Sequence, residues 1–217
     1  MTDYAERRTM MVDTQIRPSD VTKFPIIDAM LSVPREAFVP RNLREAAYVG
    51  ENIDLGGGRV MLEPRTLAKM LDALEIRSDE LVLDIGSALG YSSAVMARMA
   101  EAVVAVEENA EMISDAQGLL AENGADNVIL HEGALTAGAA EHGPYDVITL
   151  QGAVEHLPDG LNDQLKDGGR IGCLFMEGAL GVVRIGYKID GKINWRFSFN
   201  AGAPVIPGFE RHAAFTF

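Results

Sequence analysis

The stretch LDIGSALGY, residues 83–91, decides the fold because it joins an apolar, strand-like run to a helical pattern. Asp84 lies near the end of the run, and Gly86 and Gly90 follow it. In an open α/β sheet, ligands bind at the carboxyl ends of the strands, where glycines let a ligand approach the backbone. The stretch therefore predicts an α/β protein with a ligand site at this turn. The alternative is that the two glycines only form a tight strand-to-helix turn.

The spacing of the glycines separates two kinds of ligand. A dinucleotide-binding turn has the pattern G-x-G-x-x-G, so that a pyrophosphate rests on the helix N-terminus. Counted from Gly86, the other two positions hold Ala88 and Tyr91, which do not match that pattern. The pattern present, acidic-x-Gly-x-Ala-x-Gly, resembles motif I of the class I S-adenosylmethionine-dependent methyltransferases, in which the acidic residue serves the methionine end of the cofactor.

This resemblance implies that S-adenosylmethionine is the cofactor and that the turn binds it. Glu107 ends the next strand-like run, where a carboxylate can accept hydrogen bonds from both ribose hydroxyls. Gln151 ends a later run and is a candidate for the region of the transferred methyl group, although a simple loop position is the alternative. The candidate cofactor-binding residues at these strand ends are Asp84, Gly86, Ser87, Ala88, Gly90, Tyr91, Glu107 and Gln151.

Short apolar runs alternate with helical patterns after residue 80, which is typical of βαβ units and a parallel sheet. The predicted strands are residues 81–85, 102–106, 127–130, 146–150 and 170–176. Two further β-rich runs flank Asp190-Gly191, a pair that favours a tight hairpin. The sequence thus predicts an α/β class I methyltransferase (Rossmann-like) fold: a mostly parallel sheet with helices on both faces, closed by a C-terminal antiparallel hairpin.

The first part of the chain has a different sequence pattern from this core. Amphipathic stretches and a glycine-containing loop predict an N-terminal helical segment and substrate loop over residues 1–76, followed by a methyltransferase core over residues 77–217. The loop, residues 50–64, contains Gly56-Gly57-Gly58. Three consecutive glycines are conformationally free, so this loop is expected to be mobile or pressed against a ligand.

The composition is that of an ordinary globular protein, with 217 residues, 47% of them hydrophobic and 24% charged. The formal net charge of −13 repels phosphate backbones and anionic membranes, so neither nucleic acid nor a membrane is expected as a partner. One cysteine, Cys173, and an N-terminus without an apolar signal-like stretch favour a cytoplasmic protein. No metal site is expected, because no helical metal-ligand spacing links His131, His142, His156 and His212.

Several segments resemble the protein-L-isoaspartate (D-aspartate) O-methyltransferase family, and they occur in the same order. They are VPREAFVP at 33–40, AY at 47–48, the glycine loop up to Pro64, GYSSAV at 90–95, PYDVI at 144–148 and LKDGGR at 165–170. The resemblance covers roughly residues 5–176, and VPREAFVP is its most family-specific part. It implies methyl transfer from S-adenosylmethionine to the carboxyl group of isoaspartyl residues in damaged proteins, as a step of repair.

The chain departs from the family at two places. The family has a catalysis-associated serine shortly before the helix that begins at Pro64, and this chain has Leu62 there. After the third strand the family has G-D-G, whose aspartate faces the adenine amino group, whereas this chain has Gly133-Ala134. The resemblance thus implies an adenine contact at Gly133 and Ala134 that is lost or made by backbone, and the methyl acceptor stays open.

Arg59 and Arg65 flank Leu62 and are candidates for orienting an acidic substrate through charge-assisted hydrogen bonds. The alternative is that both are solvated or pair with nearby acids. A substrate carboxyl with a pKa of about 4 is ionised at neutral pH, so methyl transfer needs no general base. A serine hydroxyl could help to orient the substrate but would remove no proton. If carboxyl methylation is the reaction, a local positive patch formed by Arg59 and Arg65 is expected in this acidic molecule.

Three functions compete at this stage. The first is the isoaspartyl methyltransferase, acting on isoaspartyl-containing peptides or proteins. The second is a family member that binds S-adenosylmethionine without catalysis, or that methylates another acceptor, which Leu62 and Ala134 motivate. The third is a nicotinamide-dependent oxidoreductase, which the missing third glycine and the terminal hairpin disfavour. The sequence makes no prediction of oligomeric state.

Overall fold

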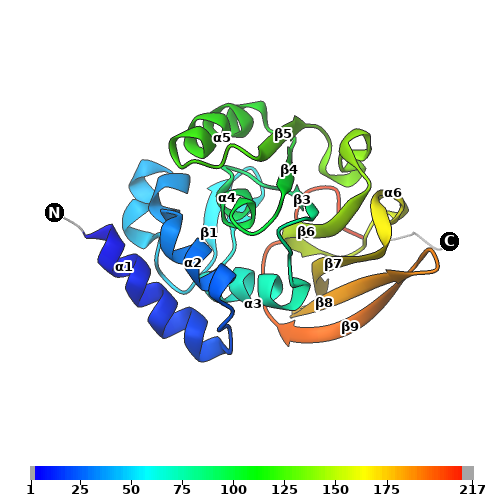
Figure 1. The fold of residues 1–217 in the computed structure, drawn as a ribbon, viewed down its shortest axis with the longest axis horizontal. Coiled ribbons are helices and arrows are strands. Elements are labelled where there is room, and N and C mark those ends of the chain that lie inside the picture. The colour runs from blue at the N-terminus through cyan, green and yellow to red at the C-terminus, as the bar shows by residue number, and fades with distance from the viewer. Residues whose placement is uncertain (1–2, 212–217) are drawn as a thin grey trace.

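A sheet of seven strands in the order β5-β4-β3-β6-β7-β8-β9 organises the chain (Figure 1). The computed structural model describes residues 3–211. The strands are β3 (Leu81–Ile85), β4 (Ala102–Glu107), β5 (Val128–Glu132), β6 (Tyr145–Val154), β7 (Leu165–Glu177), β8 (Leu180–Ile189) and β9 (Lys192–Asn200). The pairs from β5 to β7 are parallel, and the β7–β8 and β8–β9 pairs are antiparallel. The predicted parallel sheet with an antiparallel end is confirmed.

Apolar side chains on both faces explain why the central strands form a buried parallel sheet. Successive residues of a strand point to opposite faces, and buried Val82 and Leu83 accordingly belong to two different apolar clusters. The first cluster lies beneath α3 (Pro64–Leu74), α4 (Tyr91–Ala97) and α5 (Ala110–Glu122). The second lies beneath α6 (Asp159–Gln164) and the short turns η5 (Leu135–Ala137) and η6 (Ala140–His142). Helices therefore cover both faces, as predicted.

The N-terminal region packs on the first of these faces. It consists of α1 (Tyr4–Met11), η1 (Val12–Ile16), η2 (Arg17–Ser19), α2 (Phe24–Ser32), η3 (Arg35–Phe38) and η4 (Arg41–Ala46). Its buried side chains, among them Ile16, Met30 and Phe38, belong to the same apolar cluster as Val82 and Val103 of the sheet. The N-terminal region is thus part of the core that supports the strand ends.

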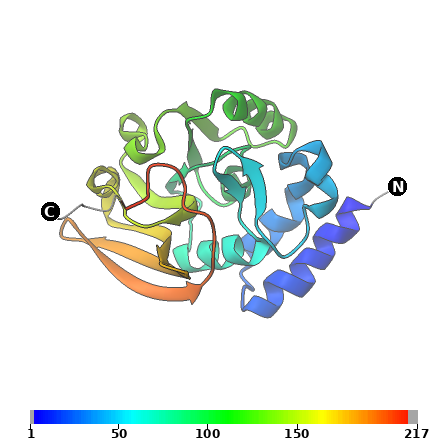
Figure 2. The ribbon, with the colours of Figure 1, turned by 180° about the vertical axis from the view of Figure 1, so that it is seen from behind.

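The glycine loop folds as a short antiparallel hairpin of β1 (Ile53–Gly56) and β2 (Arg59–Met61). All three glycines adopt positive φ values, 83°, 60° and 74°, which a residue with a side chain rarely adopts. A Cβ atom at Gly58 would lie 2.9 Å from Pro207, so the turn packs closely on the C-terminal segment. Figure 2 shows the hairpin beside this segment, drawn in red. The hairpin therefore packs against the C-terminal segment.

The C-terminal hairpin turns at the predicted dipeptide. Asp190 and Gly191 have φ values of 51° and 74°, the two left-handed residues that a tight hairpin requires. After β9 the chain returns over the second face, where Ile206 and Phe209 are fully buried. Among residues 3–211, no helix is long and apolar enough to span a membrane.

Candidate functional site

The turn between β3 and α4 brings two acidic residues to neighbouring strand ends. Gly86, Ala88 and Gly90 have φ values of 76°, 48° and 93°, and a positive φ is uncommon for an alanine. The N–H groups of Gly86 and Ser87 donate to the carbonyl of Val106 at 2.9 and 3.2 Å. These bonds hold the turn against β4, so that the carboxyl ends of β3 and β4 form one site.

Asp84 is fully buried at this site and accepts hydrogen bonds on both carboxylate oxygens. Ser92 and Ser93 of α4 donate to Oδ2 at 2.6 Å each, and Gln151 of β6 donates to Oδ1 at 2.7 Å. Burial raises the pKa of Asp84 to about 6, because desolvation outweighs these three stabilising hydrogen bonds. The structure thus brings Asp84 and Gln151 together.

Glu107 ends β4 with its carboxylate wholly shielded from solvent. The backbone N–H groups of Ala88, Glu108 and Asn109 donate to it at 3.1, 2.9 and 3.0 Å. The guanidinium of Arg59 adds a bidentate contact, with Nε on Oε2 at 2.9 Å and Nη2 on Oε1 at 3.0 Å. A carboxylate offers about four lone-pair positions, so these five donors leave no acceptor for a further ligand in this conformation.

Arg59 therefore does not face an open substrate site as expected. Its side chain is only 2% exposed and also contacts Glu108 at 2.9 Å. Arg65 lies on the surface, 3.9 Å from Glu63 and with its guanidinium 5.8 Å from the ring centre of Phe199. The predicted positive patch is not formed, because the two acidic residues at the end of β4 hold the Arg59 guanidinium inside the molecule.

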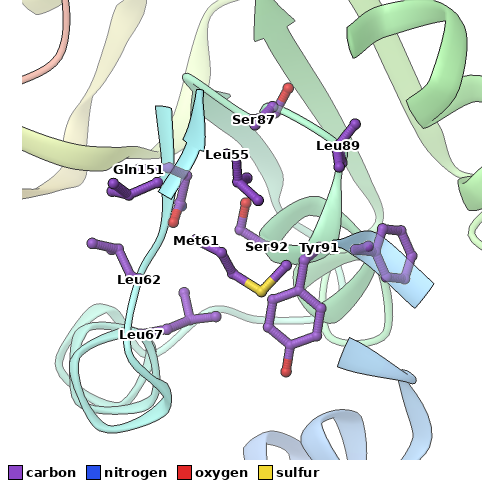
Figure 3. A pocket seen from close by; sticks show the side chains of 12 residues that line it. Leu55, Met61, Leu62, Leu67, Ser87, Leu89, Tyr91, Ser92 and Gln151 are labelled. Atoms are coloured by element: carbon purple, nitrogen blue, oxygen red, sulfur yellow. The ribbon is translucent and has the colours of Figure 1, made fainter. Parts of the chain in front are cut away.

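Leu62, at the family serine position, lies between β2 and α3 and is 2% exposed. It lines a cavity of about 20 Å³, room for roughly one water molecule. Figure 3 shows Leu55 and Met61 of the hairpin in the space between the turn residues Ser87 and Leu89 and the helix residue Leu67. The hairpin side chains thus fill the space in front of the glycine turn.

Arg35 is a residue of this site whose role the sequence did not reveal. Its guanidinium is fully buried and donates to the carbonyls of Ala47 and Leu62, both at 2.7 Å. It also lies 4.9 Å from the ring centre of Tyr91, and burial lowers its pKa. Nη1 of Arg35 and the hydroxyl of Tyr91 have no hydrogen-bond partner within residues 3–211. The VPREAFVP segment was the only signal for this residue, and Arg35 positions the backbone at Leu62.

Gly133 and Ala134 follow β5 at the edge of the same site. The N–H of Gly133 donates to the carbonyl of Glu107 at 3.1 Å, so this backbone is tied directly to the end of β4. A Cβ at position 133 would lie 2.9 Å from Nε2 of His131, which shows that the imidazole packs over the glycine. The two residues are thus adjacent to Glu107, with backbone and no carboxylate in the position of the family aspartate.

Spacing along a single helix does not reveal the side-chain cluster of His131, Glu141 and His142. His131 comes from β5 and the other two from η6, and their ligand atoms all lie within 4.8 Å of one another. His156 instead faces the carbonyl of Phe209 at 3.3 Å, and His212 lies outside the described residues. The fold thus brings together, from separate elements, three side chains of metal-ligand type.

These features define the class of protein. A parallel sheet ending in antiparallel β8 and β9, with acidic residues at the ends of β3 and β4 on either side of a glycine turn, is the class I methyltransferase fold. The family model for protein-L-isoaspartate (D-aspartate) O-methyltransferase matches residues 6–177. The chain belongs to this family, and the resemblance found in the sequence is confirmed.

Curated relatives and solved structures agree with that assignment. The chain is 39% identical over 169 residues to a protein-L-isoaspartate O-methyltransferase of Methylorubrum extorquens, covering 78% of this chain and 74% of the relative. It is 37% identical over 165 residues to a second such protein from Pelobacter propionicus, covering 76% and 73% of the two chains.

Two solved structures share the fold. A protein-L-isoaspartate O-methyltransferase superposes with a TM-score of 0.79 at 23% identity, over 95% of this chain and 66% of its own. The beta-aspartate methyltransferase of Plasmodium falciparum, in complex with S-adenosyl-L-homocysteine, gives a TM-score of 0.79 at 18% identity, over 95% and 99% of the two chains. The two structures thus share the fold over nearly the whole chain at low sequence identity.

Proposed function

We propose that this protein transfers a methyl group from S-adenosylmethionine to the carboxyl group of isoaspartyl or D-aspartyl residues in damaged peptides and proteins. Family membership over residues 6–177 is the observation that carries the proposal. The names of the curated relatives support the acceptor, and the S-adenosyl-L-homocysteine complex of the Plasmodium falciparum protein supports the cofactor. Membership of this family also removes the nicotinamide-dependent oxidoreductase alternative.

The chemical types of the residues at the strand ends suit the parts of S-adenosylmethionine. Glu107 would accept the ribose hydroxyls, Asp84 and Gln151 would serve the methionine end, and Gly133 and Ala134 would lie at the adenine edge. The turn that approaches the ligand would comprise Gly86, Ser87, Ala88, Gly90 and Tyr91. When bound, the cofactor supplies an electrophilic methyl group on a positively charged sulfur.

Arg59 occupies the carboxylate that is proposed to bind the cofactor. The guanidinium occupies both oxygens of Glu107, and the cavity in front of the turn is about 20 Å³. Ribose hydroxyls would therefore compete with Arg59 for the Glu107 carboxylate, and cofactor binding would require the β1–β2 hairpin to move with its arginine. Once released, Arg59 is a candidate partner for the substrate carboxylate, because guanidinium groups frequently bind carboxylates through two parallel hydrogen bonds.

The reaction needs orientation more than proton transfer. The substrate carboxylate is already ionised at neutral pH, so no group of the protein has to remove a proton from it. Leu62, buried and apolar, excludes water, and Arg35 fixes the backbone at Leu62 through a 2.7 Å hydrogen bond. Holding the attacking oxygen in line with the methyl group is then the main contribution to the rate.

The direct test is methyl ester formation on matched peptides. The protein is incubated with methyl-labelled S-adenosylmethionine and an isoaspartyl peptide, and base-labile methyl ester is counted. The same peptide with ordinary aspartate is the control. Ester on the isoaspartyl peptide alone supports the proposal. An absence of ester while cofactor binding persists overturns the acceptor, and an absence of cofactor binding overturns the proposal entirely.

A second candidate is a family member that binds S-adenosylmethionine without this catalysis. Two observations favour it: the saturation of Glu107 by Arg59, and Leu62 in the position of the family serine. Wild-type protein without ester formation, together with turnover after Leu62→Ser, would support this candidate. Robust turnover by the wild type removes it.

We also propose a cytoplasmic location and peptides or proteins as the partners. The single cysteine, Cys173, is buried and unpaired in β7, which suits a reducing compartment. The net charge of −13 opposes binding to nucleic acid and to anionic membranes.

A further inference from the structure

We propose that His131, Glu141 and His142 bind a divalent transition-metal ion, with zinc as the best match. The site is separate from the methyl-transfer chemistry proposed above and does not depend on it. His131 lies near the end of β5, while Glu141 and His142 belong to η6, and the three potential ligand atoms lie within 4.8 Å of one another.

The distances suit shared coordination better than direct hydrogen bonding. Nδ1 of His131 and Nε2 of His142 each lie 3.4 Å from Oε1 of Glu141. Hydrogen bonds from N–H to oxygen are about 2.7 to 3.2 Å long, so both contacts are longer than usual. In tetrahedral zinc sites with bonds of about 2.0 to 2.2 Å, neighbouring ligand atoms lie about 3.4 Å apart. These two separations therefore match two edges of a zinc tetrahedron.

The surroundings hold the imidazoles in this arrangement. The His131 ring packs over Gly133, where a Cβ would lie 2.9 Å from Nε2 and 3.2 Å from Cδ2. The rings of His131 and His142 meet edge to face, with centres 5.5 Å apart. Glycine at position 133 thus leaves the space that the His131 ring needs.

The ligand types and exposure indicate the kind of ion. Two imidazoles and one carboxylate are the protein ligands of several catalytic zinc sites, which keep a fourth position for water. The side chain of His131 is 20% exposed and that of Glu141 69%, so the open side of the cluster faces solvent. An ion here would tie β5 to η6 and stiffen the segment between them, which includes Gly133 and Ala134.

Isothermal titration of the untagged, EDTA-treated protein with zinc chloride at pH 7.5 tests the proposal. We expect saturable binding of about one ion per chain. Even residues that only support ligands contribute about 10- to 100-fold to metal affinity, so His131→Ala and His142→Ala should each weaken binding at least about tenfold. His156→Ala, which removes a histidine outside the cluster, should leave the affinity unchanged. Cobalt(II) should give the visible absorption of a tetrahedral site in the wild type and in His156→Ala, and not in His131→Ala or His142→Ala.

Two results would overturn the proposal: no saturable zinc binding by the wild type, or full binding by the His131→Ala/His142→Ala double variant. Because the cluster is partly exposed, the two single variants and the double variant are all expected to fold. Circular dichroism checks this. Gly133→Ala is a second, independent variant, since it retains all three ligands and displaces only the His131 ring. It should weaken zinc binding, and unchanged binding there contradicts the geometry described above.

Discussion

Arg59 donates two parallel hydrogen bonds to Glu107, 2.9 and 3.0 Å long, and both side chains are buried. The pair joins the β1–β2 hairpin to the end of β4, where the ribose of the cofactor is proposed to bind. The ion pair thus holds the hairpin against the proposed cofactor site. Moving the hairpin away from this site would break the ion pair.

Replacing Arg59 should increase the affinity for the cofactor and lower the stability of the protein without ligand. Arg59→Ala frees the Glu107 carboxylate for ribose, and hydrogen bonds to charged groups contribute about 1.5 to 3 kcal/mol, which corresponds to at least about a tenfold gain in affinity. Breaking a buried ion pair costs about 3 to 5 kcal/mol, so the unliganded variant should melt at a lower temperature. Calorimetric titration with S-adenosylhomocysteine and thermal melts measure both effects.

Arg65→Ala is the matched control for that experiment, because Arg65 lies nearby in the chain, at the start of α3, and its side chain is 41% exposed. It should change neither quantity appreciably. Equal or weaker ligand affinity in Arg59→Ala than in the wild type would show that Arg59 does not compete with the ligand.

Arg35→Met should lower the free energy of unfolding, because it removes the hydrogen bonds that hold the backbone at Leu62. The change leaves the buried carbonyls of Ala47 and Leu62 without their donor, and an unsatisfied buried group costs about 1 to 3 kcal/mol. Arg35→Lys should rescue little, because a lysine cannot reproduce the guanidinium fork. Urea unfolding measures the free energy of unfolding, with Arg65→Met as the exposed counterpart. A loss below about 0.5 kcal/mol, the usual size for a surface substitution, would contradict this role.

Asp84 should make stability depend on pH in the direction opposite to most carboxylates. Its pKa is raised from 3.8 to about 6, so the folded protein binds its proton more tightly than the unfolded chain does. This favours folding at low pH, and the advantage is lost as the pH rises from about 4 to about 6. The full change is about 3 kcal/mol, of which about 1 kcal/mol falls between pH 5 and pH 7.5.

Asp84→Asn, which cannot titrate, isolates this contribution. The free energy of unfolding of the variant minus that of the wild type should increase by about 1 kcal/mol between pH 5 and pH 7.5. Urea unfolding at the two pH values gives the difference. A difference that is the same at both would mean that the pKa of Asp84 is not raised.

Leu62→Ser should change the turnover on isoaspartyl peptide less than tenfold, because the ionised carboxylate needs no base. Leu62→Ala is the control, since it also removes the apolar side chain but adds no hydroxyl. Initial rates of methyl ester formation at saturating cofactor compare the three proteins. A gain far above tenfold for serine but not for alanine would show that the hydroxyl is required for catalysis.

The sequence predicted the sheet well because its parallel strands are buried on both faces and are therefore apolar throughout. The Asp190-Gly191 turn was equally clear, since few other dipeptides adopt two left-handed conformations. The β1–β2 hairpin was missed. Its strands, Ile53–Gly56 and Arg59–Met61, are too short to show an alternating pattern.

The contacts of the site could not be predicted in the same way. Arg59 and Glu107 lie 48 residues apart, and nothing local indicates that one pairs with the other. Arg35 is a fully buried arginine, and charged residues are so seldom buried that the pattern alone favours the surface. The cluster of His131, Glu141 and His142 exists only because β5 and η6 meet in space.

Glu107 is proposed to bind the cofactor after Arg59 has left its carboxylate. A crystal structure of the wild-type protein with S-adenosylhomocysteine tests this most directly. We predict ribose hydroxyls on the Glu107 carboxylate, the Arg59 guanidinium out of hydrogen-bond range of it, and the β1–β2 hairpin displaced from the glycine turn. Ligand bound while the 2.9 and 3.0 Å contacts between Arg59 and Glu107 persist would contradict the account.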